Sequence, residues 1–156
     1  MNIIGVHECK MDNKGRAMLP SALKKQLMPV LEKGFVVKRS VFQKCLELYP
    51  IEEWNQVMSK VNSLNRFVKK NNDFIRMFTA GVKVVELDGT GRLNISNDLI
   101  AYAGLKNSLV MSSAVNMIEI WDKDAYEQVL NNPDVDFGAL AEDVMGNNNP
   151  LGDGLS

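Results

Sequence analysis

The sequence contains few of the residues on which enzyme chemistry depends. It has one histidine, His7, in 156 residues, which excludes metal sites and proton relays that need two histidines. Its two cysteines, Cys9 and Cys45, lack the paired spacing of a zinc site and provide no disulfide framework. The sequence also lacks a glycine-rich phosphate loop. We therefore expect no catalytic site, no cofactor and no bound metal.

Long apolar stretches are also lacking. The apolar runs extend over only a few residues, which is too short to span a bilayer. The first residues, Met-Asn-Ile-Ile-Gly-Val-His-Glu, have neither the basic start nor the apolar segment of a secretory signal peptide. With 46% hydrophobic and 24% charged residues, the composition is typical of a globular protein. We expect a cytoplasmic protein with free thiols and no membrane partner.

The formal net charge of −1 is distributed unevenly along the chain. Residues 1–83 contain fifteen Lys and Arg against seven Asp and Glu, which gives a net charge of +8. Residues 84–156 contain three against twelve, which gives −9. A basic half of this kind indicates a polyanionic partner such as a nucleic acid. The alternative is that the basic and acidic faces attract each other between subunits.

The sequence contains an internal repeat. Asp12-Asn13-Lys14-Gly15-Arg16 recurs as Asp88-Gly89-Thr90-Gly91-Arg92, and Leu46-Glu47-Leu48-Tyr49 recurs as Ile118-Glu119-Ile120-Trp121. The chain is therefore interpreted as two copies of one unit of roughly fifty residues. We expect a first unit over residues 1–54, connecting helices over 55–78, a second unit over 79–130 and a mostly flexible C-terminal tail over 131–156.

Each unit is expected to be α+β and mainly β. An extended segment (residues 3–11 or 79–87) leads into the glycine turn, and a short strand follows with Ala17 and Leu19 pointing inward. A brief helix capped by Ser21 or Asn97 comes next, then a hairpin whose second strand hides Leu46 and Leu48 and exposes Glu47. A longer helix starts after Pro50, and residues 66–78 continue the helical pattern.

One such unit cannot easily cover its own strand edges. We therefore predict that the two copies pair into one barrel-like core with pseudo-twofold symmetry. In the tail, Phe137, Leu140 and Val144 are spaced to form one or two amphipathic helical turns.

The candidate functional site is the glycine turn of each copy. Gly15 and Gly91 are expected to adopt positive φ, with Asp12 and Asp88 capping the turn through their side chains. In one interpretation an Asp–Arg pair braces each turn. In the other, Arg16 is exposed and contacts bases or phosphates, because its planar guanidinium donates two parallel bonds. The expected DNA-binding residues are Lys14 and Arg16, with Arg92, Lys10, Lys38 and Arg39 as further candidates.

These residues resemble the MraZ family. The resemblance covers residues 1 to about 130 and is carried by Asp12-x-Lys14-Gly15-Arg16-x-x-x-Pro20, Leu46-Glu47-Leu48-Tyr49-Pro50 with Trp54, Phe78-x-x-Gly81, Asp88-x-x-Gly91-Arg92, Tyr102-Ala103-Gly104-Leu105 and Ile118-Glu119-Ile120-Trp121. It implies two SpoVT-AbrB-like units forming a swapped-hairpin β-barrel, in which Lys14 and Arg16 lie on the DNA-contacting turn. The second copy departs from the pattern at Thr90 and Ser96, which puts its DNA contact in doubt.

The resemblance also implies a function. It indicates a bacterial transcriptional regulator, usually a repressor, that forms ring-shaped homo-oligomers associated with the nucleoid. These rings would bind tandem DNA repeats upstream of the division and cell-wall gene cluster. Two alternatives remain open: an antitoxin-like AbrB regulator, and a non-catalytic protein-interaction scaffold.

Overall fold

The computed structural model describes residues 1–147, so the last nine residues of the predicted flexible tail lie outside the described part. The chain is α+β, as predicted, and divides into a compact unit Met1–Tyr126 and a second that starts at Glu127. The strands are β1 (Val6–Lys10), β2 (Arg16–Met18), β3 (Phe35–Arg39), β4 (Leu46–Pro50), β5 (Lys83–Val85), β6 (Arg92–Asn94), β7 (Ser108–Ala114) and β8 (Met117–Asp122). The helices are α1 (Ser21–Leu27), α2 (Ile51–Asn62), α3 (Lys69–Phe78), α4 (Asn97–Ala103), α5 (Lys123–Leu130) and α6 (Phe137–Ala141), with a 3₁₀ helix η1 (Met28–Lys33) and a π-helical turn η2 (Glu142–Asn147).

Six strands form one antiparallel sheet in the order β1-β7-β8-β4-β3-β5. The first strand of each copy pairs with the hairpin of the other copy: β1 pairs with β7, and β5 pairs with β3. The equivalent strands β4 and β8 pair at the centre. Exchanging every strand for its counterpart in the other copy leaves this order unchanged apart from its direction. The two copies are therefore interleaved in one sheet, with β1 and β5 at its ends.

The strands β2 and β6 form a separate two-stranded antiparallel ribbon in which the two copies meet directly. Ala17 lies opposite Leu93, and these side chains are buried, with 0% and 2% exposure. Side chains alternate between the two faces along a strand, so the flanking residues share the opposite, outward face. They are Arg16, Met18, Arg92 and Asn94.

One hydrophobic cluster contains the buried side chains of both copies. Leu23 of α1 and Leu48 of β4 belong to it, and so do their counterparts in the second copy, Leu99 and Ile120. Separating the copies would expose this apolar surface to water, at a cost of about 25 cal/mol for each Å². The burial of apolar side chains therefore holds the two copies together as one body.

The short helices α1 and α4 follow the ribbon strands as predicted, but their expected caps are wrong. The structure places Pro20 and Ser96 at the N-cap positions, one residue earlier than Ser21 and Asn97, and no side-chain cap bond forms. The proline already has the extended backbone of an N-cap residue, with φ −53° and ψ 136°, so the helix begins directly after it.

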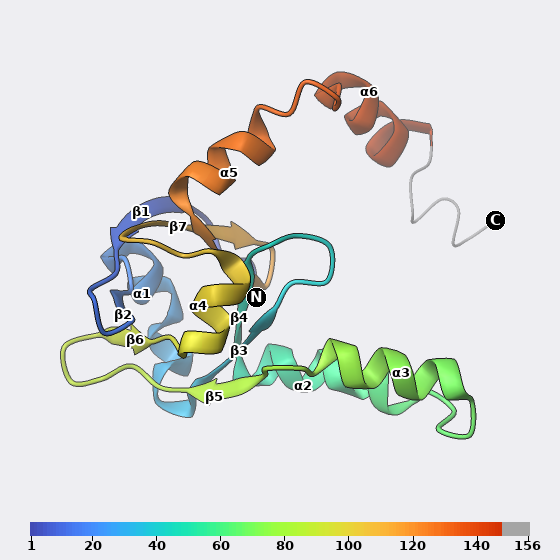
Figure 1. Cartoon of the computed structure of the whole chain (residues 1–156), viewed down its shortest axis with the longest axis horizontal. Coiled ribbons are helices and arrows are strands. Elements are labelled where there is room, and N and C mark those ends of the chain that lie inside the picture. The colour runs from blue at the N-terminus through green and yellow to red at the C-terminus, as the bar shows by residue number, and fades with distance from the viewer. Residues whose placement is uncertain (148–156) are drawn as a thin grey trace. The chain divides into compact units, whose positions relative to one another are not determined.

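Helices α2 and α3 form an antiparallel hairpin (Figure 1). Helix α2 starts after Pro50 with Glu52 and Glu53 in its first turn, where negative charge is favoured by the helix dipole. The ring of Trp54 in α2 stacks on that of Phe78 in α3, with 6.1 Å between ring centroids. This aromatic contact joins the two helices where α3 returns to the sheet.

The predicted amphipathic turn in the tail is confirmed by helix α6. It begins at Asp136, whose side chain accepts a hydrogen bond from the Ala139 amide at 3.2 Å, and it continues into η2. Within residues 1–147, none of the helices combines the length and the apolar character needed to cross a bilayer.

Candidate nucleic-acid interface

The first glycine turn is organised by the carboxylate of Asp12. Its Oδ1 accepts hydrogen bonds from the backbone amides of Lys14 (2.9 Å) and Arg16 (3.0 Å), and its Oδ2 accepts one from Arg16 Nε (2.7 Å). Gly15 has φ +80°, as predicted, and a Cβ at this position would lie 2.7 Å from the backbone oxygen of Ile95. Glycine is therefore required both by the backbone conformation and by the close approach of the other copy.

The second turn repeats this geometry. Asp88 accepts hydrogen bonds from the backbone amides of Thr90 and Arg92, both at 2.9 Å, and from Arg92 Nε at 3.0 Å. Gly91 has φ +85°. The two turns also bond to each other's strands, because the Leu19 amide donates to Gly91 O and the Ile95 amide donates to Gly15 O. The Asp–Arg brace, one of the two interpretations of the sequence, is therefore present in both copies.

The ribbon brings the two arginines to one outward face, which we call the paired-turn face. It consists of the two glycine turns together with Arg16, Met18, Arg92 and Asn94. Arg92 Nη1 lies 3.9 Å from Asp12 Oδ2, so the second arginine also approaches the carboxylate of the first turn. Each guanidinium has five N–H donors, and the brace fixes its orientation through Nε. The position of Nε also orients the two terminal Nη groups, whose remaining N–H donors are available to a ligand on this face.

A lysine lies beside each turn, and only the lysine of the first turn was predicted. Lys14 is exposed at the first turn, whereas the second turn has the uncharged Thr90. A Cβ placed on Gly91 would lie 3.2 Å from Lys24 Nζ, so the ammonium of Lys24 in α1 reaches the second turn. Its counterpart Ile100 occupies the equivalent place beside Gly15. The Lys24-to-Ile100 difference between the copies is the sequence signal that could have identified this cation.

The remaining candidates lie elsewhere. Lys10 is exposed at the end of β1, and its Nζ donates a hydrogen bond to Ser108 Oγ at 2.8 Å. Arg39 lies at the end of β3, with its guanidinium carbon 4.8 Å from the ring centroid of Tyr102. It lines a pocket with α3 and α4 rather than the paired-turn face.

The expectation that Lys38 contacts DNA needs correction. Its side chain is 1% exposed, and its Nζ donates to the carbonyl oxygen of Arg39 and lies 3.6 Å from Glu47 Oε1. Glu47, predicted to be exposed, has a side chain that is only 13% exposed because it is opposite Lys38 in the β3–β4 pair. Burial lowers the pKa of Lys38. Lys38 is an enclosed partner of Glu47 and cannot reach a phosphate in this conformation.

The carboxylates of the paired-turn face are held in the ionised form. The backbone amide of Arg16, more than any other group, holds the pKa of Asp12 below its usual value of 3.8. The amide of Arg92 lowers the pKa of Asp88 in the same way. The thiols have the opposite tendency, because burial raises the pKa of Cys9 to about 11 and that of Cys45 to about 12. Neither thiol is therefore activated as a nucleophile.

The fold and the paired turns define a protein made of two interleaved copies of one α+β unit, with an Asp–Arg-braced turn contributed by each. The chain belongs to the MraZ family. The family model described as "MraZ protein, putative antitoxin-like" matches residues 3–77 and again residues 77–148. The two matches correspond to the two copies of the repeat.

Curated relatives resemble the chain over almost its whole length. The transcriptional regulator MraZ of Christiangramia forsetii is 63% identical over 147 residues, covering 94% of this chain and 95% of the relative. The transcriptional regulator MraZ of Flavobacterium psychrophilum is 60% identical over 154 residues, covering 99% and 98%. That of Cytophaga hutchinsonii is 38% identical over 141 residues, covering 90% and 93%.

Proposed function

We propose that the chain is a sequence-specific DNA-binding transcriptional regulator and not an enzyme. It acts in the cytoplasm, associated with the nucleoid, as a repressor of the division and cell-wall gene cluster. The observation that carries this proposal is the paired-turn face, where Lys14, Arg16, Lys24 and Arg92 converge from both copies. The relatives from Christiangramia forsetii and Flavobacterium psychrophilum are named transcriptional regulators, which supports the same function.

The chemistry of the paired-turn face suits double-stranded DNA. The arginines have oriented guanidinium groups whose Nη donors match guanine edges or phosphate oxygens. Lys14, which is exposed, and Lys24, which is half-buried, add positive charge without a fixed direction, which suits phosphates. Asp12 and Asp88 would repel phosphates if they were unpaired, but each is neutralised by its own arginine. The face therefore combines orientation with positive charge.

A single paired-turn face is too small to read a long DNA site. We infer that several chains assemble into a ring, so that their paired-turn faces engage tandem DNA repeats together. Binding of the second face is then intramolecular, and the overall affinity exceeds that of one face by a factor of about 10² or more. The acidic second half of each chain would be directed away from DNA or toward neighbouring subunits.

We also infer that the six-stranded sheet and the ribbon close into the swapped-hairpin barrel of two SpoVT-AbrB-like units. In this proposal the units cover residues 1–54 and 79–130, with residues 55–78 as the connecting helices. The exchange of β1 and β5 between the copies supports it, because each copy completes the other's hairpin.

Replacing both cations of the first turn tests the proposed function. The double variant Lys14→Ala/Arg16→Ala should bind DNA from just upstream of the protein's own gene more weakly than the unaltered chain. The slope of log K against log salt should become shallower by about one for each phosphate that the variant no longer neutralises. Fluorescence anisotropy over a range of salt concentrations measures both quantities.

A control must separate the removal of these two cations from a general decrease in positive charge. The variant Lys60→Ala/Lys70→Ala removes two exposed lysines from the α2–α3 hairpin and should retain affinity and salt slope. Light scattering establishes that both variants keep the same oligomeric mass. The proposal fails if the Lys14→Ala/Arg16→Ala variant binds the same DNA with unchanged affinity and an unchanged salt slope.

A further inference from the structure

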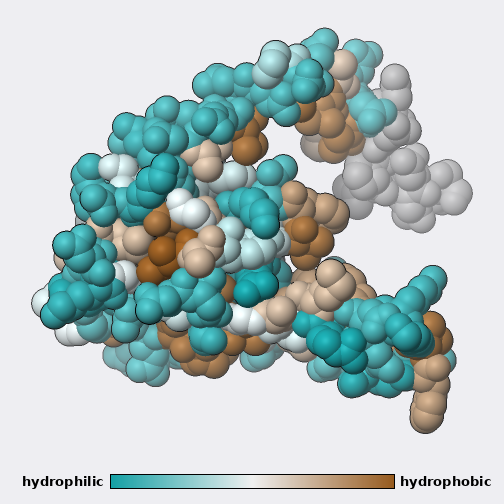
Figure 2. Space-filling view, viewed as in Figure 1, coloured by the Kyte–Doolittle hydropathy of each residue, from teal (hydrophilic) through white to brown (hydrophobic). Residues whose placement is uncertain are grey.

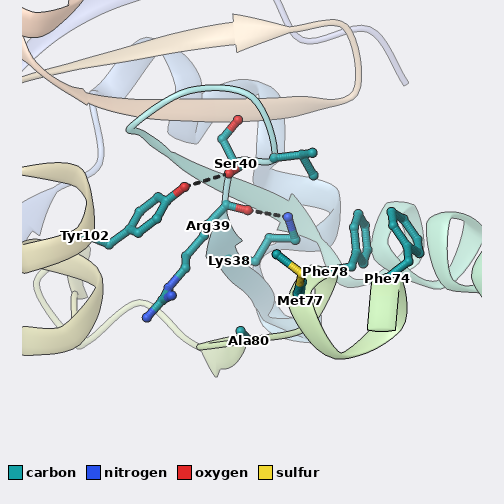
Figure 3. A pocket seen from close by; sticks show the side chains of 9 residues that line it. Lys38, Arg39, Ser40, Phe74, Met77, Phe78, Ala80 and Tyr102 are labelled. Carbon is teal, nitrogen blue, oxygen red and sulfur yellow. Dashed lines mark hydrogen bonds between the residues drawn. The ribbon is translucent and has the colours of Figure 1, made fainter. Parts of the chain in front are cut away.

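A pocket of about 320 Å³ opens between the end of β3, helix α3 and helix α4. We call it the α3 pocket. Figure 3 shows Arg39 and Tyr102 on one side of it, and Phe74, Met77 and Phe78 on the other. The apolar side is open to solvent, since Phe74 is 44% exposed and Met77 is 78% exposed. Large apolar side chains exposed around a hollow are typical of an interaction surface.

The other side of the α3 pocket carries positive charge. Lys44 Nζ lies 4.6 Å from the ring centroid of Tyr102, and Arg39 Cζ lies 4.8 Å from it. Within the described part of the chain, neither cation has a carboxylate within 4 Å. Arg39 Nε is buried and has no hydrogen-bond acceptor there. The exposed ammonium of Lys44 beside Tyr102 favours an incoming acidic group on this side.

The C-terminal segment has the complementary chemistry. Residues 127–147 contain five acidic residues and neither lysine nor arginine. Helix α6 and η2 expose Phe137 (79%), Leu140 (48%) and Met145 (74%), and the space-filling view shows this apolar surface over α6 (Figure 2). With Val144, which is 46% exposed, the apolar residues Phe137, Leu140 and Val144 have the i, i+3, i+7 spacing of an amphipathic helix that docks in a groove. Glu142 follows Leu140 by two residues in the sequence, and its side chain is exposed.

We propose that residues 136–147 of one protein chain dock in the α3 pocket of another chain of the same protein. Phe137 and Leu140 pack against the Phe74 and Met77 side, and Glu142 reaches the cations beside Tyr102. The charges favour this occupant, since an acidic segment without a single cation meets two cations without a carboxylate partner.

The symmetry of this contact determines what it can build. Every chain carries one segment and one pocket, so two chains can exchange their segments reciprocally in a twofold dimer, or each chain can dock its segment on the next one head-to-tail. Head-to-tail contacts build closed rings when the rotation closes and open filaments when it does not. The inference rests on the self-assembly in the proposed function and adds the two surfaces that make the contact.

Disulfide trapping between two differently tagged copies tests the contact. One chain carries Met77→Cys and the other chain carries Leu140→Cys, and the mixture of the two chains is oxidised under mild conditions. The native thiols are protected because burial raises their pKa values, to about 11 for Cys9 and about 12 for Cys45. In the control mixture, Met28→Cys replaces Met77→Cys, because Met28 is also exposed (60%). We expect the Met77→Cys and Leu140→Cys chains to form a mixed disulfide at about tenfold higher yield than the control mixture. Equal yields for the two pairs would overturn the proposal.

Charge reversal gives an independent measurement. Lys44→Glu should raise the dissociation constant of self-association, measured by analytical ultracentrifugation, about tenfold. Adding Glu142→Lys to the same chain should restore association, whereas Glu127→Lys, which changes the charge equally, should not. A Lys44→Glu chain that associates like the unaltered protein would contradict the contact.

The failure of this contact can be told apart from the failure of DNA binding. The variant Lys14→Ala/Arg16→Ala leaves the α3 pocket and the segment intact, so it should form the disulfide at the normal yield. If that variant loses DNA binding while Met77→Cys and Leu140→Cys fail to couple, the regulator stands and the docking contact does not.

Discussion

At the scale of single residues, the first glycine turn depends on an absent side chain. Gly15 has φ +80°, a conformation that costs an L-residue about 1–2 kcal/mol, and a Cβ there would be 2.7 Å from Ile95 O. We expect Gly15→Ala to lower the free energy of unfolding by at least about 2 kcal/mol, measured by urea denaturation. Gly89 of the second turn is the matched control, because its Cβ would meet no atom within 4 Å. A Gly15→Ala chain as stable as Gly89→Ala would contradict this explanation of the turn.

The turn carboxylates make stability depend on acid pH. The pKa of Asp12 lies below 3.8 in the folded chain because backbone amides donate to the charged form. The contribution of ionised Asp12 to the stability of the fold is therefore fully present at pH values above 3.8, the pKa of this carboxyl in the unfolded chain. This contribution disappears as the pH falls through the lower pKa of Asp12 in the folded chain. We expect Asp12→Asn to be less stable than the unaltered chain at neutral pH, with a difference that narrows as the pH falls below 3.8.

Carboxyl carbon chemical shifts followed by NMR report the titration of Asp12 directly. A midpoint at or above the usual 3.8 would contradict the hydrogen bonds assigned to this side chain. A stability difference that stays constant through the acid range would do the same, since only a shifted pKa makes the difference depend on pH.

At the scale of elements, the central strands place two glutamates opposite each other. Glu47 of β4 faces Glu119 of β8, and Lys38 of β3 lies opposite Glu47 on its other side. Replacing Lys38 by methionine leaves the glutamate pair without its cation in a largely buried place. We expect Lys38→Met to cost about 3–5 kcal/mol of unfolding free energy, measured by chemical denaturation.

The double variant Lys38→Met/Glu47→Leu removes the charge together with its partner. It should recover most of the stability that Lys38→Met removes, because a hydrophobic replacement of a buried ion pair is often neutral. The recovery should be incomplete, because the hydroxyl of the buried Tyr49 donates to Glu47 at 3.0 Å and loses this acceptor in the double variant. If Lys38→Met alone were neutral, the ion pair would not be needed to accommodate Glu47.

The comparison of sequence and structure also belongs at this scale. The repeat predicted the turn chemistry, because Asp12, Gly15 and Arg16 act within five consecutive residues. The difference between Lys24 and its counterpart Ile100 marks a cation that only one copy has. It does not show that Lys24 reaches the second turn, since this contact joins residues far apart in the sequence. The burial of Lys38 was missed for a related reason: a lysine on an alternating strand is expected at the surface, and only the tertiary position of Glu47 explains its enclosure.

At the scale of the whole molecule, the repeat predicted that the copies share one core, but not the order of the strands. The exchange of β1 and β5 depends on pairings between residues far apart in the sequence, such as His7 with Met111 and Phe35 with Val85. The apolar pattern that defines a strand does not select its partner. The charge asymmetry likewise predicted a basic surface without showing where the cations converge.

The shared core makes a prediction about cooperativity. Trp54 lies in α2 of the first copy and Trp121 in β8 of the second, so each reports on one copy. The variants Trp54→Phe and Trp121→Phe each leave one tryptophan in the chain. Because the hydrophobic cluster contains side chains of both copies, neither copy can unfold without exposing the other's apolar surface.

The two tryptophans should therefore report one transition. In each variant, the unfolding transition seen by tryptophan fluorescence should have the same urea midpoint and the same m-value as the transition seen by circular dichroism. After correction for the different stabilities of the two variants, the two tryptophans should also give the same midpoint. Two copies that folded as separate domains would give different midpoints within one variant, one by tryptophan fluorescence and another by circular dichroism. Such a separation would show that the interleaved strands do not couple the copies, and the single shared core would then be wrong.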